Sequence, residues 1–282
     1  VEMGEGRAAI LPTIRPLGEF EEDRVLFESA DHSTVDLDPP VAALDRLLHL
    51  APLVRRWIER LPGHLAALYG EDVVVPASSA DALWLTRDLT ELMDEIETEG
   101  ADWSKLGDLV PEGLANWWQV TLAFLSIVSE QWPAMLAELG RSNPAAHRNA
   151  LIRAEAERLQ RNPPVGPVIV AGSTGSIPAT AELLHVIARL PNGAIVLPGL
   201  DQGLDEAAWN AVGRTAEDPS VYGHPQYQLR KLIAHLRVLR GDVEAIADAP
   251  AHRTLRLAAL SEALRPADTT DAWAEHRSAY SQ

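Results

Sequence analysis

A glycine-rich turn is the first feature of this sequence whose residue types could do chemistry. The stretch from Pro167 to Leu190 reads PVIVAGSTGSIPATAELLHVIARL, which predicts a buried strand, a turn with Gly172 and Gly175, and a helix. Backbone N–H groups at a helix start bind phosphate readily, and parallel sheets keep their ligand sites at the carboxyl ends of strands. The turn is therefore a candidate phosphate or ligand site.

Two common phosphate-binding motifs do not match this turn. A P-loop needs a lysine that reaches the terminal phosphates, and no lysine follows Gly172 within the turn. A dinucleotide fingerprint needs closely spaced glycines and a later acid that binds the ribose, whereas Asp201 comes only after the second predicted strand. A nucleotide-dependent small-molecule enzyme that uses the Gly172–Gly175 loop stays open as an alternative function.

The other interpretation of the turn is structural. In it, Gly172 and Gly175 permit a tight turn with close backbone approach, and Thr174 or Ser176 caps the following helix. The residues that both interpretations concern are Gly172, Ser173, Thr174, Gly175 and Asp201.

A second candidate is the stretch from Val221 to Gly241, where aromatic and basic residues alternate. Aromatic side chains beside positive charges suit stacking on single-stranded DNA together with neutralisation of its phosphates. The candidate DNA-binding residues are Tyr222, His224, Tyr227, Arg230, Lys231 and Arg237. An ordinary amphipathic helix, opened by Pro225 and burying Leu229, Leu232, Ile233 and Leu236, is the alternative, and both can hold at once.

Other reactive residue types form no recognisable catalytic or metal-binding motif. His32 lies among the acids Asp31, Asp36 and Asp38, which is the composition of a solvated loop. No nucleophile elbow surrounds the serines of the glycine turn. The chain has no cysteine, which excludes disulfides, thiolate metal sites and a cysteine nucleophile. We therefore predict no catalytic residue and no metal site.

Composition indicates a soluble protein with a substantial core. Of its 282 residues, 46% are hydrophobic, and the net charge of −17 argues against uniform coating of DNA. The acids are concentrated early, with eight of them between Glu19 and Asp38, whereas arginines gather in the second half. We find no signal-peptide pattern and no apolar run that we expect to cross a membrane, so the predicted location is cytoplasmic.

The elements that would position these residues follow from periodicity. Residues 8–20 predict a short strand, and residues 41–113 read as helices with a kink or break at Pro52 and a cap at Ser78 or Ser79. An apolar seam runs from Leu114 to Leu139, where Trp117, Trp118 and Trp132 are expected in the core. Strand, helix and strand follow after residue 165, in the pattern of a parallel crossover unit.

This order predicts an α/β fold with a helical insertion. Residues 1–40 would begin the α/β domain, residues 41–164 would form the helical subdomain, and residues 165–282 would return to the α/β domain and end in helices.

Several motifs, in order through nearly the whole chain, resemble one protein family. The longest is VIVAGSTGSIPATAELLHVIARLPNGAIVLPGLD, and it is followed by HPQYQLRKLI and SEALRPADTTDAW. Earlier in the chain come LPTIRPLGEFEED and DLVPEGLANWWQVTLAFLSIVSEQWP. These stretches are similar to AddB, the second subunit of the bacterial AddAB helicase–nuclease, which processes double-strand DNA breaks.

The resemblance implies a RecA-like, superfamily 1 helicase-type parallel-sheet domain interrupted by a largely helical subdomain. In AddB relatives the strand before the glycine turn often ends in an acid, a remnant of the helicase metal-binding carboxylate. This chain has Ala171 at that place, so the carboxylate is missing. The resemblance therefore implies a helicase-like part without motor chemistry, which serves homologous recombination and break repair as a scaffold for the DNA path and the partner subunit.

The resemblance also implies what the parent complex supplies. The partners would be the AddA-type helicase–nuclease subunit and DNA, as double-strand ends and single strands. ATP and Mg²⁺ would be used by the parent complex, and its iron–sulfur cluster would lie in a nuclease domain beyond this chain. We expect no cofactor and no nuclease activity in this fragment.

Overall fold

The computed structural model describes residues 37–69, 78–103, 115–214, 219–247 and 250–276, together with residues 14, 16, 17 and 105. The chain divides into two compact units, one up to Ala154 and the other from Glu155 onward. The strand expected within residues 8–20 lies almost entirely outside the described residues, as do His32 and its neighbours Asp31 and Asp36.

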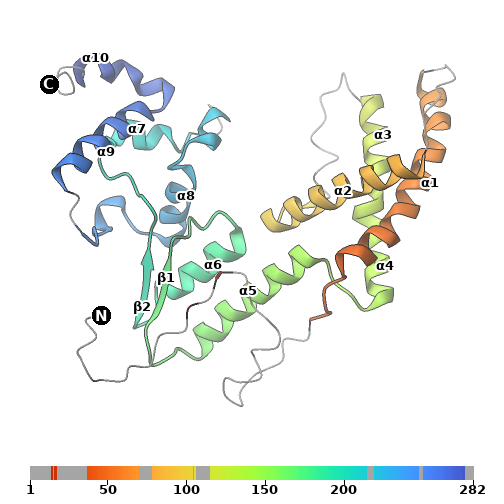
Figure 1. Cartoon of the computed structure of the whole chain (residues 1–282), viewed down its shortest axis with the longest axis horizontal. Coiled ribbons are helices and arrows are strands. Elements are labelled where there is room, and N and C mark those ends of the chain that lie inside the picture. Colours follow the sequence, from red (N-terminus) through yellow and green to blue (C-terminus); the bar gives the residue numbers. More distant parts are fainter. Residues whose placement is uncertain are drawn as a thin grey trace. The chain divides into compact units, whose positions relative to one another are not determined.

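The N-terminal unit is helical (Figure 1). Its helices are α1 (Ala43–Tyr69), α2 (Ser79–Glu99), α3 (Ala115–Ser126) and α4 (Trp132–Leu139), and helix α5 (Pro144–Arg161) crosses the boundary between the units. A short π-helical segment, Ile127–Gln131, joins α3 to α4. Helix α4 starts at Trp132 with Pro133 in its first turn, where proline costs no hydrogen bond.

Local signals set the ends of α2. The Ser78 side chain accepts from the backbone N–H of Asp81, while the Asp81 side chain accepts from the N–H of Ser78, which forms a capping box. Gly100 ends the helix in the left-handed region, with φ of 64°. The Ser78 cap confirms the sequence prediction.

Helix α1 runs through Pro52, so of the predicted kink or break the break is wrong. A proline in a helix interior removes one backbone hydrogen bond and costs about 3 kcal/mol. The side chains around it offset that cost by burial: Leu50, Leu53, Val54 and Ile58 all lie in the core. Tertiary packing here outweighs the local preference.

A buried polar chain lies within this core. Trp132 is completely buried, and its indole Nε1 donates to Asn143 Oδ1 at 2.8 Å. Asn143 Nδ2 in turn donates to Glu97 Oε1 at 2.5 Å. The Asn143 side chain therefore links Trp132 of α4 to Glu97 of α2. Burial raises the pKa of Glu97 from its usual value, against the attraction of Arg46, which lowers it. The expectation that Trp132 is a core residue is confirmed, and Trp117 lies outside the described side chains.

One segment, Trp118–Leu139, is long and apolar enough to cross a membrane by length and composition alone, which the sequence analysis did not expect. Core helices of soluble proteins meet the same criterion, and in this chain the segment contributes Ile127, Val128 and Trp132 to the core with α1 and α2.

The C-terminal unit contains a small parallel sheet. Strand β1 (Val168–Ala171) pairs with β2 (Gly193–Val196) in register from Val168 opposite Gly193, and helix α6 (Pro178–Ile187) connects them. The predicted strand–helix–strand unit is confirmed, and the chain is α/β in this general sense. The remaining helices are α7 (Glu206–Ala211), α8 (Tyr227–Leu236), α9 (Ala251–Ala263) and α10 (Trp273–His276) (Figure 1).

Replacing Glu97 by Gln should raise the free energy of unfolding at neutral pH. A carboxyl whose pKa is raised by folding binds more protons in the native state, so its presence makes stability fall as pH rises from the unfolded pKa through the native one. Glutamine keeps an oxygen acceptor for Asn143 and removes the charge. We expect the gain over the original protein at pH 7 to shrink as pH falls through the raised native pKa of Glu97 and to be lost below the ordinary pKa of a glutamate, measured by urea unfolding.

An equal gain at pH 4 and pH 7 would contradict this account. Glu91→Gln is the control, because Glu91 lies exposed on α2 in a surface pair with Arg87.

Candidate nucleic-acid interface

The glycine turn has the backbone that its residues predict. Gly172 has φ of 79° and Gly175 has φ of 60°, both in the left-handed region that glycine adopts without strain. A Cβ on Gly175 would lie 2.7 Å from Leu232 Cδ1, so this glycine also permits close packing of the turn on α8. The turn therefore packs against α8.

The predicted helix cap is wrong. Helix α6 has Ile177 at its N-cap position and no side-chain cap, with Pro178 at its start. Ser173 instead accepts from the N–H of Gly175 at 3.2 Å, so its hydroxyl stabilises the turn rather than the helix. Neither Thr174 nor Ser176 provides the hydrogen bond expected of it.

Asp201 is also used to shape its own loop. Its Oδ1 accepts from the N–H groups of Gly203 and Leu204, at 2.9 and 3.0 Å. Gln226, just before α8, donates to Gly199 O and accepts from the N–H of Asp201. The loop after β2 is thus closed by hydrogen bonds between side chains and the backbone, and one oxygen of the Asp201 carboxylate is used within the loop.

Helix α8 is amphipathic, as the structural alternative predicted. Leu229, Leu232, Ile233 and Leu236 are all buried. Arg230 leaves this helix on the side of α7, where its Nη1 donates to Trp209 O at 2.6 Å and its guanidinium lies over the Trp209 ring, 5.2 Å from the centroid. Burial lowers the pKa of Arg230. This arginine serves the fold and is poorly placed to neutralise a phosphate.

His224 is likewise held by the protein. Its Nδ1 accepts from the N–H of Gln226, and its Nε2 faces Leu264 O at 2.7 Å. These two partners require a neutral ring with the proton on Nε2. His224 therefore links the start of α8 to the end of α9.

The exposed face of α8 keeps the remaining candidates together. Tyr227, Lys231 and His235 recur every four residues, so they lie along one side of the helix. The ring of Tyr222, 58% exposed, meets Tyr227 edge to face with centroids 5.1 Å apart. At the other end the ring of His235 lies 5.2 Å from that of His185. This row of aromatic and basic side chains is called the α8 face below.

Lys231 on the α8 face and Arg237 beside it have no side-chain partner among the described residues. Lys231 is exposed, and Arg237 is exposed just after the helix, with a left-handed backbone at φ of 57°. Of the six residues predicted to bind DNA, the structure thus leaves Tyr222, Lys231 and Arg237 accessible. It uses His224 and Arg230 in internal contacts, and the sixth, Tyr227, is half-buried against the core that contains Trp209.

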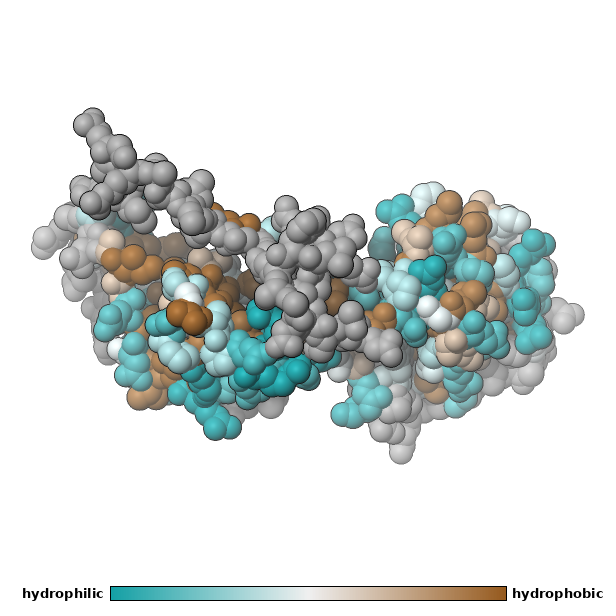
Figure 2. Space-filling model, turned by 90° about the horizontal axis from the view of Figure 1, so that it is seen from below, coloured by the Kyte–Doolittle hydropathy of each residue, from teal (hydrophilic) through white to brown (hydrophobic). Residues whose placement is uncertain are grey.

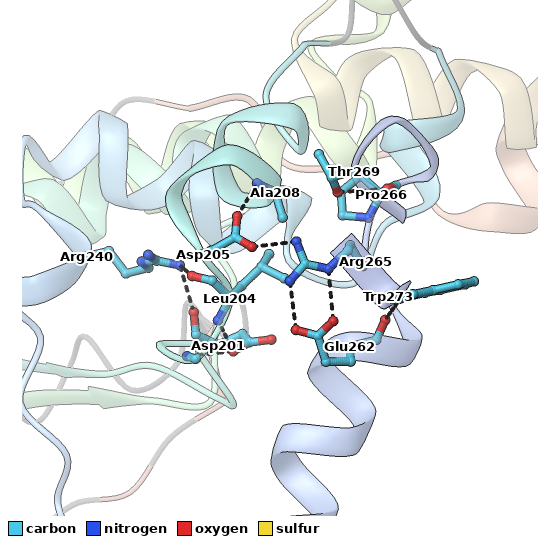
Figure 3. A network of polar contacts seen from close by, with 11 residues as sticks. Asp201, Leu204, Asp205, Ala208, Arg240, Glu262, Arg265, Pro266, Thr269 and Trp273 are labelled. Atoms are coloured by element: carbon cyan, nitrogen blue, oxygen red, sulfur yellow. Dashed lines mark hydrogen bonds and ion pairs between the residues drawn. The ribbon is translucent and has the colours of Figure 1, made fainter. Parts of the chain in front are cut away.

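A polar network that the sequence analysis did not identify lies beside this region (Figure 3). The side chain of Arg265 is almost fully buried and pairs with Asp205 at 2.5 Å and with Glu262 at 2.7 Å. Hydrogen bonding to Glu262 is the main cause that raises the pKa of Arg265. The Asp205 side chain accepts from the N–H of Ala208 and so caps α7. This hydrogen bond, and after it the one from Arg265, lowers the pKa of the Asp205 carboxyl.

Arg240 completes the surroundings of Trp209. Its guanidinium lies 4.8 Å from the centroid of that ring and donates to Leu204 O at 2.6 Å. The sequence offered one signal for this network, an acid placed to cap the helical stretch EAAWNA. The arginine partners come from residues far along the chain and had no such signal.

Comparison with known proteins identifies no relative. No family model, curated protein or solved structure matches the chain. Among the residues that the structure describes, no three histidine or acidic side chains gather as a metal would require.

Replacing Arg230 by Ala should lower the free energy of unfolding by about 1–3 kcal/mol, because Trp209 O loses its donor and the indole ring loses its cover. Lys231→Ala, one residue further on, should change it by less than about 0.5 kcal/mol. Urea unfolding measures both. Equal stability of the two variants would show that Arg230 is not used by the fold.

Proposed function

We propose that this chain is a helicase-like, non-motor part of an AddB-type subunit that guides a DNA strand and holds a partner subunit during double-strand break repair. The observation that carries the proposal is the exposure of Tyr222 and Lys231 on the α8 face and of Arg237 beside it. Ser173 of the glycine turn and Asp201, in contrast, accept hydrogen bonds within their own loops. An exposed group of aromatic and basic side chains suits a scaffold that binds DNA.

The ordered series of AddB-like motifs supports the DNA and partner assignments, and the RecA-like architecture remains part of the proposal. Within it, residues 165–282 would belong to the helicase-like α/β domain. Tyr222 would stack on a base, and Lys231 with Arg237 would neutralise phosphates. The Ala171 that ends β1 in place of an acid fits a domain that does not bind the metal of a motor.

Binding of a fluorescent oligothymidylate to the full chain, followed at several salt concentrations, tests the DNA assignment. For the double variant Lys231→Ala, Arg237→Ala we expect about tenfold weaker binding and a salt slope smaller by about 1.4, since each contact with a single-strand phosphate contributes about 0.7. Tyr222→Ala should weaken binding by about 1–3 kcal/mol and leave the slope unchanged, because stacking releases no counterion.

A matched control removes two charges elsewhere, with Arg55→Ala and Arg56→Ala on exposed positions of α1. If this control loses as much affinity as the α8 double variant, the binding is general attraction and the assignment is wrong. Absence of any salt-dependent binding by the original protein would also overturn it.

The alternative enzyme function rests on the left-handed turn at Gly172 and Gly175, which follows a parallel strand at its carboxyl end. Thermal unfolding with increasing ATP or NADPH separates the two functions. We expect no saturable rise in melting temperature, because the turn lacks a lysine and packs on Leu232. A saturable rise that Gly172→Ala abolishes would favour the enzyme.

A further inference from the structure

Helix α9 shows its leucines to solvent and its small and polar side chains to the protein. Ser261 is buried, and Ala258 and Glu262 are half-buried, whereas Leu257 is 57% exposed and Leu260 is 54% exposed. An ordinary surface helix has the opposite arrangement, with its apolar stripe against the core. The stripe on α9 is therefore oriented for contact with something other than its own core.

The exposed leucines form one continuous row. Leu257, Leu260 and Leu264 are spaced three and four residues apart, which places them on one side of the helix over a length of about 10 Å. Leu255 is 69% exposed but lies on a different side, two residues before Leu257. The spacing of the row is that by which two helices pack along a common seam.

Exposed hydrophobic residues are not unusual in this chain: on the face drawn in Figure 2, brown hydrophobic residues lie among teal hydrophilic ones. The α9 stripe differs because it borders an open groove of about 990 Å³. Leu257 and Leu260 line the groove with Ala247 and Pro250, and its charged side chains among the described residues are Arg253 and Arg256.

The charge of the groove is opposite to that of the chain. The whole sequence carries a net charge of −17, yet among the described residues that line the groove the two charged ones are arginines. Apolar lining with a basic border suits an occupant that presents leucine-like side chains flanked by carboxylates. The described lining holds no aromatic ring on which a nucleic-acid base could stack, which disfavours DNA here.

We propose that α9 and its groove dock an acidic amphipathic helix of another protein. The seam would form between the Leu257, Leu260, Leu264 row and apolar side chains of that helix, and Arg256 would pair with a carboxylate beside them. This proposal deepens the partner-holding role proposed above and rests on it, whereas the DNA-guiding role rests on the α8 face.

The probe is a labelled helical peptide of about 20 residues, made of Leu, Ala, Gln and Glu, with leucines three and four residues apart and glutamates beside them. Fluorescence anisotropy with the full chain should give saturable binding. The variant Arg256→Glu should bind it about fivefold more weakly and should bind a lysine version of the peptide more tightly than the original protein does. A variant that merely failed to fold would bind neither peptide.

Leu260→Ala should also weaken binding, whereas Leu255→Ala, an exposed leucine outside the row, is the matched control and should not. Binding insensitive to the charge reversal, or a peptide with shuffled leucines that binds equally well, would overturn the proposal. So would a dimer of the original protein that Leu260→Ala makes monomeric, or binding to phosphatidylserine vesicles in place of the peptide. Loss of peptide binding with oligothymidylate binding intact would overturn the α9 proposal and leave the DNA role in place.

Discussion

The ring of Trp209 is the point on which the C-terminal unit depends. Arg230 from α8 and Arg240 from the segment after it both lie over this indole, and each also donates to a backbone carbonyl. A guanidinium over an aromatic face keeps its charge while its carbon surface is covered, so two cations are accommodated beside a buried ring. Through Arg230 this arrangement links α7 to α8, whose buried face is made by Leu229, Leu232, Ile233 and Leu236.

The contacts with Trp209 separate two classes of basic residue that look alike in the sequence. Arg230 and Arg240 are engaged by the fold, whereas Arg237 and Lys231 stay exposed. The same distinction applies to polar residues of the loops. The acid of Asp201 and the hydroxyl of Ser173 close their own turns, so the carboxyl edge of the small sheet is shaped by internal hydrogen bonds.

Much of the local structure was predictable because its causes are local. The capping box at Ser78, the helix end at Gly100 and the buried face of α8 all depend on residues within four positions of each other. The strand–helix–strand unit was predictable because two short apolar runs flank a helix, a pattern that forms a parallel crossover unit. The side-chain partners were not, since Asn143 meets Glu97 from 46 positions away and Arg265 meets Asp205 from 60. No periodicity encodes such pairs, and burial around Pro52 overrides its propensity.

The two exposed surfaces of the C-terminal unit share short polar links. His224 ties the beginning of α8 to Leu264 O at the end of α9, and Arg265, the next residue, is pinned to the cap of α7. Because a side chain holds a backbone group or a helix cap in each case, a displacement of α9 would strain the start of α8 and the start of α7.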